Sequence, residues 1–210
     1  MFLKIKKIPR VSWSSDKPYN FKPKFSTFFF LCFGLMLFGL GEGFLIVSFT
    51  GASPWSVLAQ GISLKVNLTI GTITLLISIA VLILWIPLGQ KPGMGTIFNA
   101  LIIALMIDLC IKFVPTPSSY IYQLILAVIS VITVGIGGGI YLVSNLGAGP
   151  RDGLMIGLQK ITNLPVAAVR AFLEISVVSM GWYLGGTVGL GNAFFCVRYW
   201  SLCCFRTFFG

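Results

Sequence analysis

Long uninterrupted runs of apolar residues dominate the chain. Residues 25–90 carry only two charges, Glu42 and Lys65, and residues 113–150 carry none. A bilayer core of about 30 Å needs about 20 helical residues at 1.5 Å each. By this measure the runs predict five membrane-spanning helices and a sixth, weaker one. They lie at about 27–49, 68–88, 96–114, 120–145 and 165–185, and the sixth lies at 190–209. Proline cannot continue a helix, so Pro87 ends the second span and Pro115 ends the third.

The composition agrees with a polytopic membrane protein and excludes several other classes. Hydrophobic residues make up 57% of the chain and charged residues 10%, against about 25% in a soluble domain. A soluble enzyme, a secreted disulfide scaffold and a disordered tail protein are therefore excluded. The chain has no histidine, and its five cysteines show no CxxC spacing. We accordingly expect no enzyme activity, no catalytic residue, no metal and no cofactor.

The positive charge is concentrated at the N-terminus. Seven of the fifteen lysines and arginines precede residue 25, within a net charge of +10. We interpret residues 1–26 as a cytoplasmic segment that faces anionic lipid, in preference to a nucleic-acid-binding arm. With the N-terminus inside, Lys91, Arg151 and Lys160 also fall inside, and Lys65 and Lys112 fall outside. This asymmetry predicts a cytoplasmic N-terminus in a bacterial inner membrane.

The sequence matches itself at a shift of 96 residues. Aligned identities include Gly39 with Gly135, Pro54 with Pro150 and Asn67 with Asn163. Shared apolar composition does not align glycines, a proline and an asparagine at one offset, so we infer an internal duplication. The units are residues 27–114 and 120–194. Three spans per unit would invert the second copy, which predicts an all-α helix bundle of two inverted repeats, a layout typical of secondary transporters.

Each unit also contains a short helix that follows its first span. Gly51-Ala52-Ser53-Pro54 and Gly147-Ala148-Gly149-Pro150 are typical helix starts, with an N-cap residue before a first-turn proline. The dozen residues that follow are too few to span a membrane. We favour a position at the membrane interface, because little chain is available to descend first. A re-entrant helix, with its positive N-terminus aimed at a solute, is the alternative.

Four segments carry a family resemblance over residues 30–191. They are GASPWSVLAQGIS (51–63), WIPLGQKPGMGT (85–96), LGAGPRDGLMIGL (146–158) and GWYLGGTVGLG (181–191). In this order they resemble the YczE family of bacterial membrane proteins, relatives of the YitT group. The resemblance implies an integral inner-membrane protein and supplies no catalytic residues.

Charged residues inside apolar spans are the candidates for function, because they are expensive to keep in a bilayer. Glu42 lies in mid-span between Gly41 and Gly43. It is either a ligand or ion site, or a glutamate that bonds a neighbouring helix. The surrounding glycines either allow a helix break or form packing faces, and we favour packing. They are Gly39, Gly41 and Gly43 in the first copy and Gly135, Gly137 and Gly139 in the second.

Five further charges complete the candidate set. Asp108, in the third span, is a proton carrier or bonds a facing helix. Arg170 and Glu174 are four residues apart on one helix, so a structural pair is favoured over a counter-charge for substrate. Arg151 and Asp152 open the second short helix. Arg151 is a topology anchor or contacts an anion at the helix N-terminus.

These features favour a small secondary transporter or permease for an unknown small solute. The alternative is a non-transporting scaffold or regulator of another membrane complex. Convergence of Glu42 and Asp108 on one cavity would distinguish them, since a transporter needs it and a scaffold does not. The expected partners are the lipid bilayer and the solute, without nucleic acid, and homo-oligomerisation is left open.

The last residues break the pattern. After Phe194 the chain gains Arg198, Arg206 and three of its five cysteines, and the family motif stops. Permitted codons for this stretch, read one base later, encode Ser-Ala-Leu-Gly-Ile-Gly-Pro, which restores a sequence like that of the family. We therefore expect residues 195–210 to be the product of a frameshift.

Overall fold

The computed structural model describes residues 11–15, 19–189 and 192, and these form helices and no strand. Four of the helices are long and apolar enough to cross a membrane, namely α1, α4, α5 and α7. The sixth predicted span and the expected frameshifted tail lie outside the described residues, apart from Asn192. The helices are α1 (Phe25–Val47), α2 (Pro54–Val66), α3 (Ile70–Trp85), α4 (Met94–Phe113), α5 (Tyr120–Val143), α6 (Pro150–Thr162) and α7 (Val166–Tyr183).

The starts and ends of α2 and α6 recur 96 residues apart. Helices α2 and α6 each begin at a proline in the first turn and end at an asparagine in the left-handed conformation, Asn67 and Asn163. The loops before them turn at Gly51 and Gly147, with φ of 116° and 118°. A positive φ of this size suits glycine and strains other residues. Equivalent residues of the two sequence copies therefore adopt equivalent local structure.

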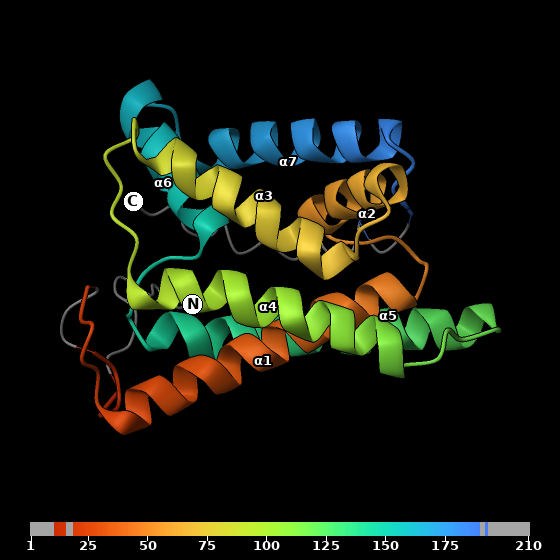
Figure 1. Cartoon of the computed structure of the whole chain (residues 1–210), viewed down its shortest axis with the longest axis horizontal. Helices are drawn as coiled ribbons and strands as arrows, with labels where there is room; N and C mark the ends of the chain where they lie inside the picture. Colours follow the sequence, from red (N-terminus) through yellow and green to blue (C-terminus); the bar gives the residue numbers. More distant parts are fainter. Residues whose placement is uncertain (1–10, 16–18, 190–191, 193–210) are drawn as a thin grey trace, which may run out of the picture.

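Helices α1 and α5 cross in close contact in the lower layer of Figure 1 and run in opposite directions. Glycines permit the approach. A Cβ added at Gly34 would lie 2.8 Å from the Tyr141 nitrogen, and one added at Gly137 would lie 2.5 Å from the Phe38 nitrogen. Gly41 also faces α5, where an added Cβ would lie 2.8 Å from the Val134 nitrogen. Backbone therefore meets backbone at this crossing, as small residues allow between membrane helices.

Helix α4 packs on another side of α1. Gly39 faces Ile103 and Met106 of α4, and Gly43 faces Cys110. The predicted packing role of Gly39 and Gly43 agrees with these contacts. The equivalent glycines of α5 behave differently within the described chain, because a Cβ added at Gly139 would meet nothing within 4 Å.

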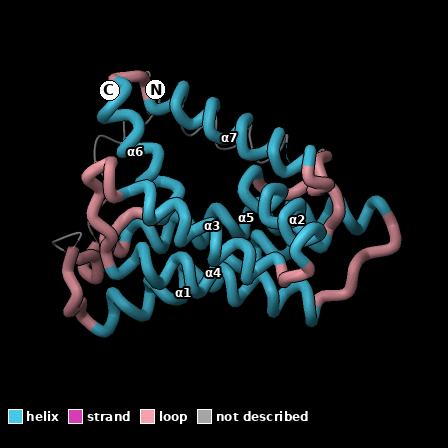
Figure 2. Tube along the Cα trace, turned by 45° about the horizontal axis from the view of Figure 1, so that its top comes forward, coloured by secondary structure: helices cyan, strands magenta, loops and turns pink. Residues whose placement is uncertain are grey.

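The short helices pack on long helices of the other sequence copy, α2 against α7 and α6 against α3. In Figure 2 the layer that contains α7 and α6 lies above that of α1 and α4. The two contacts place different residues at equivalent positions. Trp85 of α3 fills the space left by Gly153 of α6, whereas Gly181 of α7 lies against the backbone of Val57 and Leu58 of α2. Residues 85 and 181 are equivalent, and so are residues 57 and 153, so an indole ring meets glycine at one contact and glycine meets backbone at the other.

Each short helix begins in the interior and ends at the surface. Pro54 and Pro150, at the two starts, are less than 2% exposed. Leu64 and Ile161, near the two ends, are 66% and 61% exposed. Helix α3 has only 16 residues and meets α2 at an angle of 113°, the geometry of a broken span or a re-entrant loop. A helix lying on the membrane interface would expose one face along its whole length, so this burial favours the re-entrant alternative over the interfacial position that the sequence favoured.

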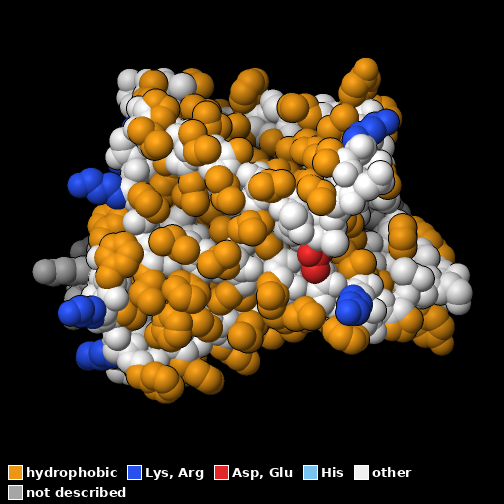
Figure 3. Space-filling model, in the orientation of Figure 1, with side chains coloured by type: hydrophobic (Ala, Val, Ile, Leu, Met, Phe, Trp, Pro, Cys, Tyr) orange, Lys and Arg blue, Asp and Glu red, His pale blue; other side chains and the backbone are white. Residues whose placement is uncertain are grey.

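Apolar side chains predominate between the two ends of the face seen in Figure 3. Lysine and arginine side chains appear at the left and right ends of this view, and one acidic group lies between them. Exposed apolar residues occur on every long helix, for example Phe29, Leu105, Ile132 and Phe172. An apolar belt with charged ends is the surface of a protein that sits in a bilayer.

Candidate functional site

Glu42 is the buried charge candidate with the richest polar surroundings. Its side chain is 1% exposed. The Oε2 atom accepts hydrogen bonds from the Ser53 and Ser56 hydroxyls, both at 2.7 Å. The two hydroxyl oxygens are themselves 2.9 Å apart. The Oε1 atom is buried and has no hydrogen-bond partner among the described residues.

Local structure brings these three side chains together. Gly41 and Gly43 hold α1 tightly against α5 and α4, and Glu42 between them is directed toward the start of α2. Ser53 precedes the first turn of α2, and Ser56 is in that turn. The Ser53 side chain does not cap the backbone of α2. Both serine hydroxyls therefore bond the carboxyl group of Glu42.

The second copy contains a matching cluster with the chemical groups exchanged. The Tyr141 hydroxyl, on α5, donates a 2.9 Å hydrogen bond to Oδ2 of Asp152, on α6. The Gly149 nitrogen donates to the same hydroxyl oxygen at 3.1 Å. Asp152 is the repeat equivalent of Ser56. The long helix thus supplies the acid in the first copy and the hydroxyl in the second.

The starts of the two short helices meet. The Arg151 guanidinium lies over the Trp55 ring, 5.5 Å from its centroid. Positions 55 and 151 are equivalent in the two copies, so this cation–π contact joins one residue to its own repeat partner. The role of Arg151 as a cytoplasmic topology anchor stays a prediction, and its half-buried side chain lies beside the start of α2.

Hydrogen bonds link each copy to the loop of the other. The Thr96 hydroxyl donates to the Ala148 carbonyl at 2.7 Å, and the Asn192 amide donates to the Ala52 carbonyl at 2.6 Å. Residues 96 and 192 are equivalent, and so are 52 and 148. The loops that lead into the short helices are therefore fixed from the opposite half, which holds the two helix starts at the centre.

Asp108 does not join the Glu42 cluster. Its carboxylate accepts from the Gly71 nitrogen at 2.7 Å and from the Thr69 hydroxyl at 2.6 Å. Thr69 is the N-cap residue of α3, so Asp108 completes the cap of a facing helix, one of the two roles expected for it. The two acids have separate partner sets, and the predicted convergence is not observed in the described chain.

Arg170 and Glu174 form the predicted pair on α7. The Arg170 Nε and Glu174 Oε1 atoms are 2.8 Å apart, and the side chains are 17% and 18% exposed. This is the structural intrahelical pair that the spacing favoured, in a partly buried position.

Several polar residues of these sites escaped the sequence analysis. Tyr141, Ser130 and Thr96 are uncharged and stand in apolar runs, so composition gave no signal for them. Ser130 donates to the Gly41 carbonyl at 2.7 Å, beside Glu42. Ser56 could have been found from the repeat, which aligns it with the candidate Asp152 in the first turn of each short helix.

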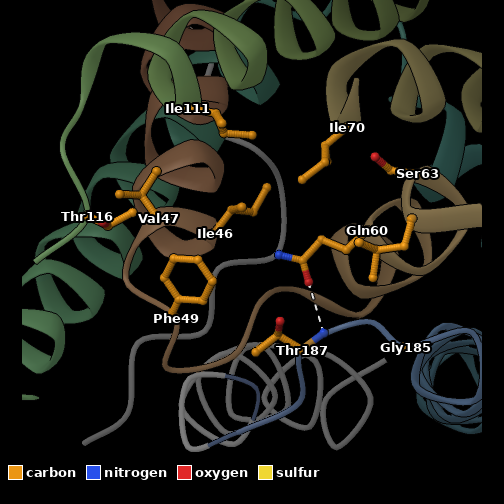
Figure 4. A pocket seen from close by; sticks show the side chains of 11 residues that line it. Ile46, Val47, Phe49, Gln60, Ser63, Ile70, Ile111, Thr116, Gly185 and Thr187 are labelled. Carbon is orange, nitrogen blue, oxygen red and sulfur yellow. Dashed lines mark hydrogen bonds between the residues drawn. The ribbon is translucent and has the colours of Figure 1, made fainter. Parts of the chain in front are cut away.

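A cavity of about 220 Å³ opens near the end of α1 that leads to α2. Its wall is mostly apolar, with Ile46, Val47 and Ile111 on one side (Figure 4). Gln60 of α2 reaches into it, and its Oε1 atom accepts from the Thr187 nitrogen at 3.1 Å. The described residues contain no group of three or more acids and cysteines arranged to hold a metal ion.

Comparison with known proteins places these features in a family. A family of unknown function, DUF6198, matches residues 25–196. An uncharacterised protein of Haemophilus influenzae is 40% identical over 91% of this chain and 87% of its own length. The uncharacterised membrane protein YczE of Bacillus subtilis is 30% identical over 79% of this chain and 77% of its own. No solved structure matches. The chain therefore belongs to the DUF6198 family of bacterial membrane proteins, to which the resemblance to YczE had pointed.

Proposed function

We propose that the protein is a small secondary permease of the bacterial inner membrane, built from two inverted repeats around a central site. The observation that supports this most is the pair of short helices, one from each copy, whose starts are buried and meet at Trp55 and Arg151. Broken helices that point their positive ends into the middle of the membrane form the solute sites of many transporters. Such helices are costly to bury unless their ends face a ligand or a counter-charge.

The arrangement of the long helices supports the inverted repeat. Helices α1 and α5 are equivalent and run in opposite directions, and so do α3 and α7 (Figure 1). The exchanged contacts of α2 with α7 and α6 with α3 are those that a two-fold axis in the membrane plane would generate. On this proposal the central site is lined by Glu42, Ser56, Tyr141, Arg151 and Asp152. The solute is small, and the site performs no covalent chemistry.

Glu42 and Asp108 have separate partners, so the convergence of these two acids that would distinguish a transporter from a scaffold is missing, and the permease proposal rests on the buried starts of the short helices instead. A solute path that uses both acids lacks support, and we assign only Glu42 to the central site. A scaffold would not require a buried carboxyl group with an unpartnered oxygen atom, because such a group lowers stability. That atom is the specific feature that favours transport over the scaffold alternative.

Substitution of the central acid tests the function. We expect Glu42→Gln to abolish activity, because glutamine keeps the size and the oxygen acceptor of glutamate but cannot exchange a proton. Metabolite pools are compared between cells that lack the protein and cells that carry the wild-type chain or the variant. Pools with Glu42→Gln should equal those of cells without the protein.

The matched control is Cys110→Ala, a small change at another buried position of the same helix packing. It should leave the pools at wild-type values, with equal amounts of all chains confirmed by immunoblot. Wild-type pools with Glu42→Gln would make Glu42 structural. If the wild-type chain itself changes no pool, the scaffold alternative is favoured.

Topology is tested at the turns between short and long helices. Leu68, after α2, and Leu164, after α6, are 41% and 50% exposed. In a cysteine-free background we expect a membrane-impermeant maleimide to label Leu68→Cys in intact cells and Leu164→Cys only after lysis. We expect this labelling because the lysines and arginines near the N-terminus place that end in the cytoplasm, and because the second copy is inverted relative to the first. Labelling of both positions from the same side would contradict the inverted repeat.

A further inference from the structure

The cavity near the end of α1 lies one helical turn from the Glu42 cluster on two helices at once. Ile46 lines it from α1, four residues after Glu42, and Gln60 lines it from α2, four residues after Ser56. Residues four apart share one face of a helix and are about 6 Å apart along its axis. Glu42 and Ser56 are joined by a hydrogen bond of 2.7 Å. The cavity is therefore next to the proposed central site, on the side where α2 reaches the surface.

Gln60 directs a hydrogen-bond donor into this cavity. Its side chain is 8% exposed, and its Oε1 atom accepts from the Thr187 backbone nitrogen at 3.1 Å. A backbone N–H can bond only the oxygen atom of a side-chain amide, so this contact fixes which end of the amide is which. The Nε2 atom then points toward Ile46 and Phe49 (Figure 4). It donates to no described residue, so the cavity contains an N–H donor that lacks an acceptor.

The size and chemistry of the wall limit what can bind. The cavity volume is about 220 Å³, and an apolar cavity of about 150 Å³ holds a benzene molecule. The described lining residues include no lysine, arginine, aspartate or glutamate, so a charged group would lose its hydration without compensation. The apolar side chains of the wall are Ile46, Val47, Phe49, Leu64, Ile70 and Ile111. A neutral molecule of roughly nine or ten non-hydrogen atoms with one acceptor fits this space, whereas a phospholipid is far too large.

The two sequence copies differ at this place. In the second copy the N-terminal segment is bonded to the end of α5. The Ser14 hydroxyl donates to the Val143 carbonyl at 2.6 Å, and the Ser15 nitrogen donates to the Ser144 carbonyl at 3.1 Å. Val143 is the repeat equivalent of Val47, which lines the cavity, and the described chain places no such segment there. In an inverted repeat these two ends would lie on opposite sides of the membrane. Access from one side only is what a permease requires in each of its alternating states.

We propose that this cavity is a binding site for a small neutral molecule that has an apolar body and a hydrogen-bond acceptor. Gln60 recognises the acceptor through its Nε2 atom, and the apolar wall holds the rest of the molecule. We take this molecule to be the solute on its way to the central site, which rests on the proposed permease function. Binding itself is measured on the purified protein and needs no transport assay.

Two probes of the same shape test the role of the donor. Acetophenone is a neutral aromatic ketone, and α-methylstyrene has a CH₂ group in place of the carbonyl oxygen. Each is added to the purified full-length protein in one detergent, so that uptake by the detergent is the same for every chain. The rise of the thermal unfolding midpoint with probe concentration gives the dissociation constant.

We expect Gln60→Met to bind acetophenone roughly three- to tenfold more weakly than the wild type does, the usual effect of one hydrogen bond. Its affinity for α-methylstyrene should be unchanged, because methionine keeps the length of the side chain and removes only the amide. The matched control is Gln159→Met, the same change on α6 and outside the cavity lining. It should bind both probes as the wild type does.

A second variant keeps the test decisive if Gln60→Met does not fold. Ile111→Trp enlarges an exposed residue of the cavity wall and should weaken the binding of both probes. A wild-type midpoint that acetophenone does not raise, or unchanged acetophenone binding by either variant, would overturn the proposed site. Displacement of acetophenone by dioleoyl phosphatidylglycerol would also overturn it, because the cavity would then belong to lipid. These results would leave the permease proposal standing on the metabolite comparison, whereas unchanged metabolite pools would leave the binding site standing without transport.

Discussion

Substitution of Gly137 by leucine should abolish the folded protein. A Cβ at this position would lie 2.5 Å from the Phe38 nitrogen and 2.6 Å from the Gly34 oxygen, both backbone atoms of α1. Backbone cannot move aside as a flexible side chain can, so α1 and α5 would have to separate. Overpacking of a core costs about 1–3 kcal/mol when side chains yield, and we expect more here. The measurement is the yield of monodisperse protein from a fluorescent fusion after size-exclusion chromatography in detergent.

Gly139→Leu provides the matched control. It introduces the same side chain on the same helix, two residues away, where an added Cβ meets nothing within 4 Å in the described chain. Its yield should equal that of the wild type. If both variants lost the same share of monodisperse protein, the cause would be the replacement of glycine in α5 itself. The close crossing with α1 would then not be the cause.

Substitution of Trp85 by alanine should lower the stability by about 3–5 kcal/mol, the usual cost when a buried tryptophan is truncated. Trp85 is 3% exposed, and its indole ring fills the space above Gly153. Its Nε1 atom also donates a 2.9 Å hydrogen bond to the Pro150 carbonyl, at the start of α6. Loss of the ring would leave a cavity beside the central site and remove this hydrogen bond. The midpoint of thermal unfolding in detergent measures the effect.

Trp182→Ala is the comparison for this change. Trp182 lies on α7 and is 69% exposed, so its removal creates no cavity in the described structure. We expect a small shift in the unfolding midpoint. If the two alanine variants are equally stable, the contact between α3 and α6 contributes little to the fold, and the proposed fixing of the α6 start by Trp85 is wrong.

The membrane class followed from the sequence alone, for a physical reason. A bilayer requires long uncharged helices, and such runs are visible in the sequence whatever the tertiary contacts are. The contacts of Gly39 and Gly43 agree with the packing expected of small residues spaced by four, but Gly139, which has the same spacing in the second copy, has no such contact in the described chain. The pair Arg170 and Glu174 depends only on helix geometry, so the spacing predicted it.

The partners of each buried acid could not be predicted, because they come from other helices. Asp108 and Glu42 are similar in the sequence, as single acids in apolar runs. Asp108 faces the start of α3 and caps it, whereas Glu42 faces Ser53 and Ser56 and keeps an unpartnered oxygen atom. The difference arises from the direction in which each side chain leaves its helix relative to a neighbour, which no local pattern specifies.

The path of the short helices was likewise decided by tertiary structure. Their length of 13 residues is compatible with the membrane interface and with a re-entrant course. The sequence determined where they begin, through Pro54 and Pro150, and where they end, through Asn67 and Asn163. Their inward direction depends on hydrogen bonds from the opposite half, Thr96 to Ala148 and Asn192 to Ala52. Local residues set the limits of a helix, but its direction is set by contacts between segments about 50 to 140 residues apart, which only the folded chain brings together.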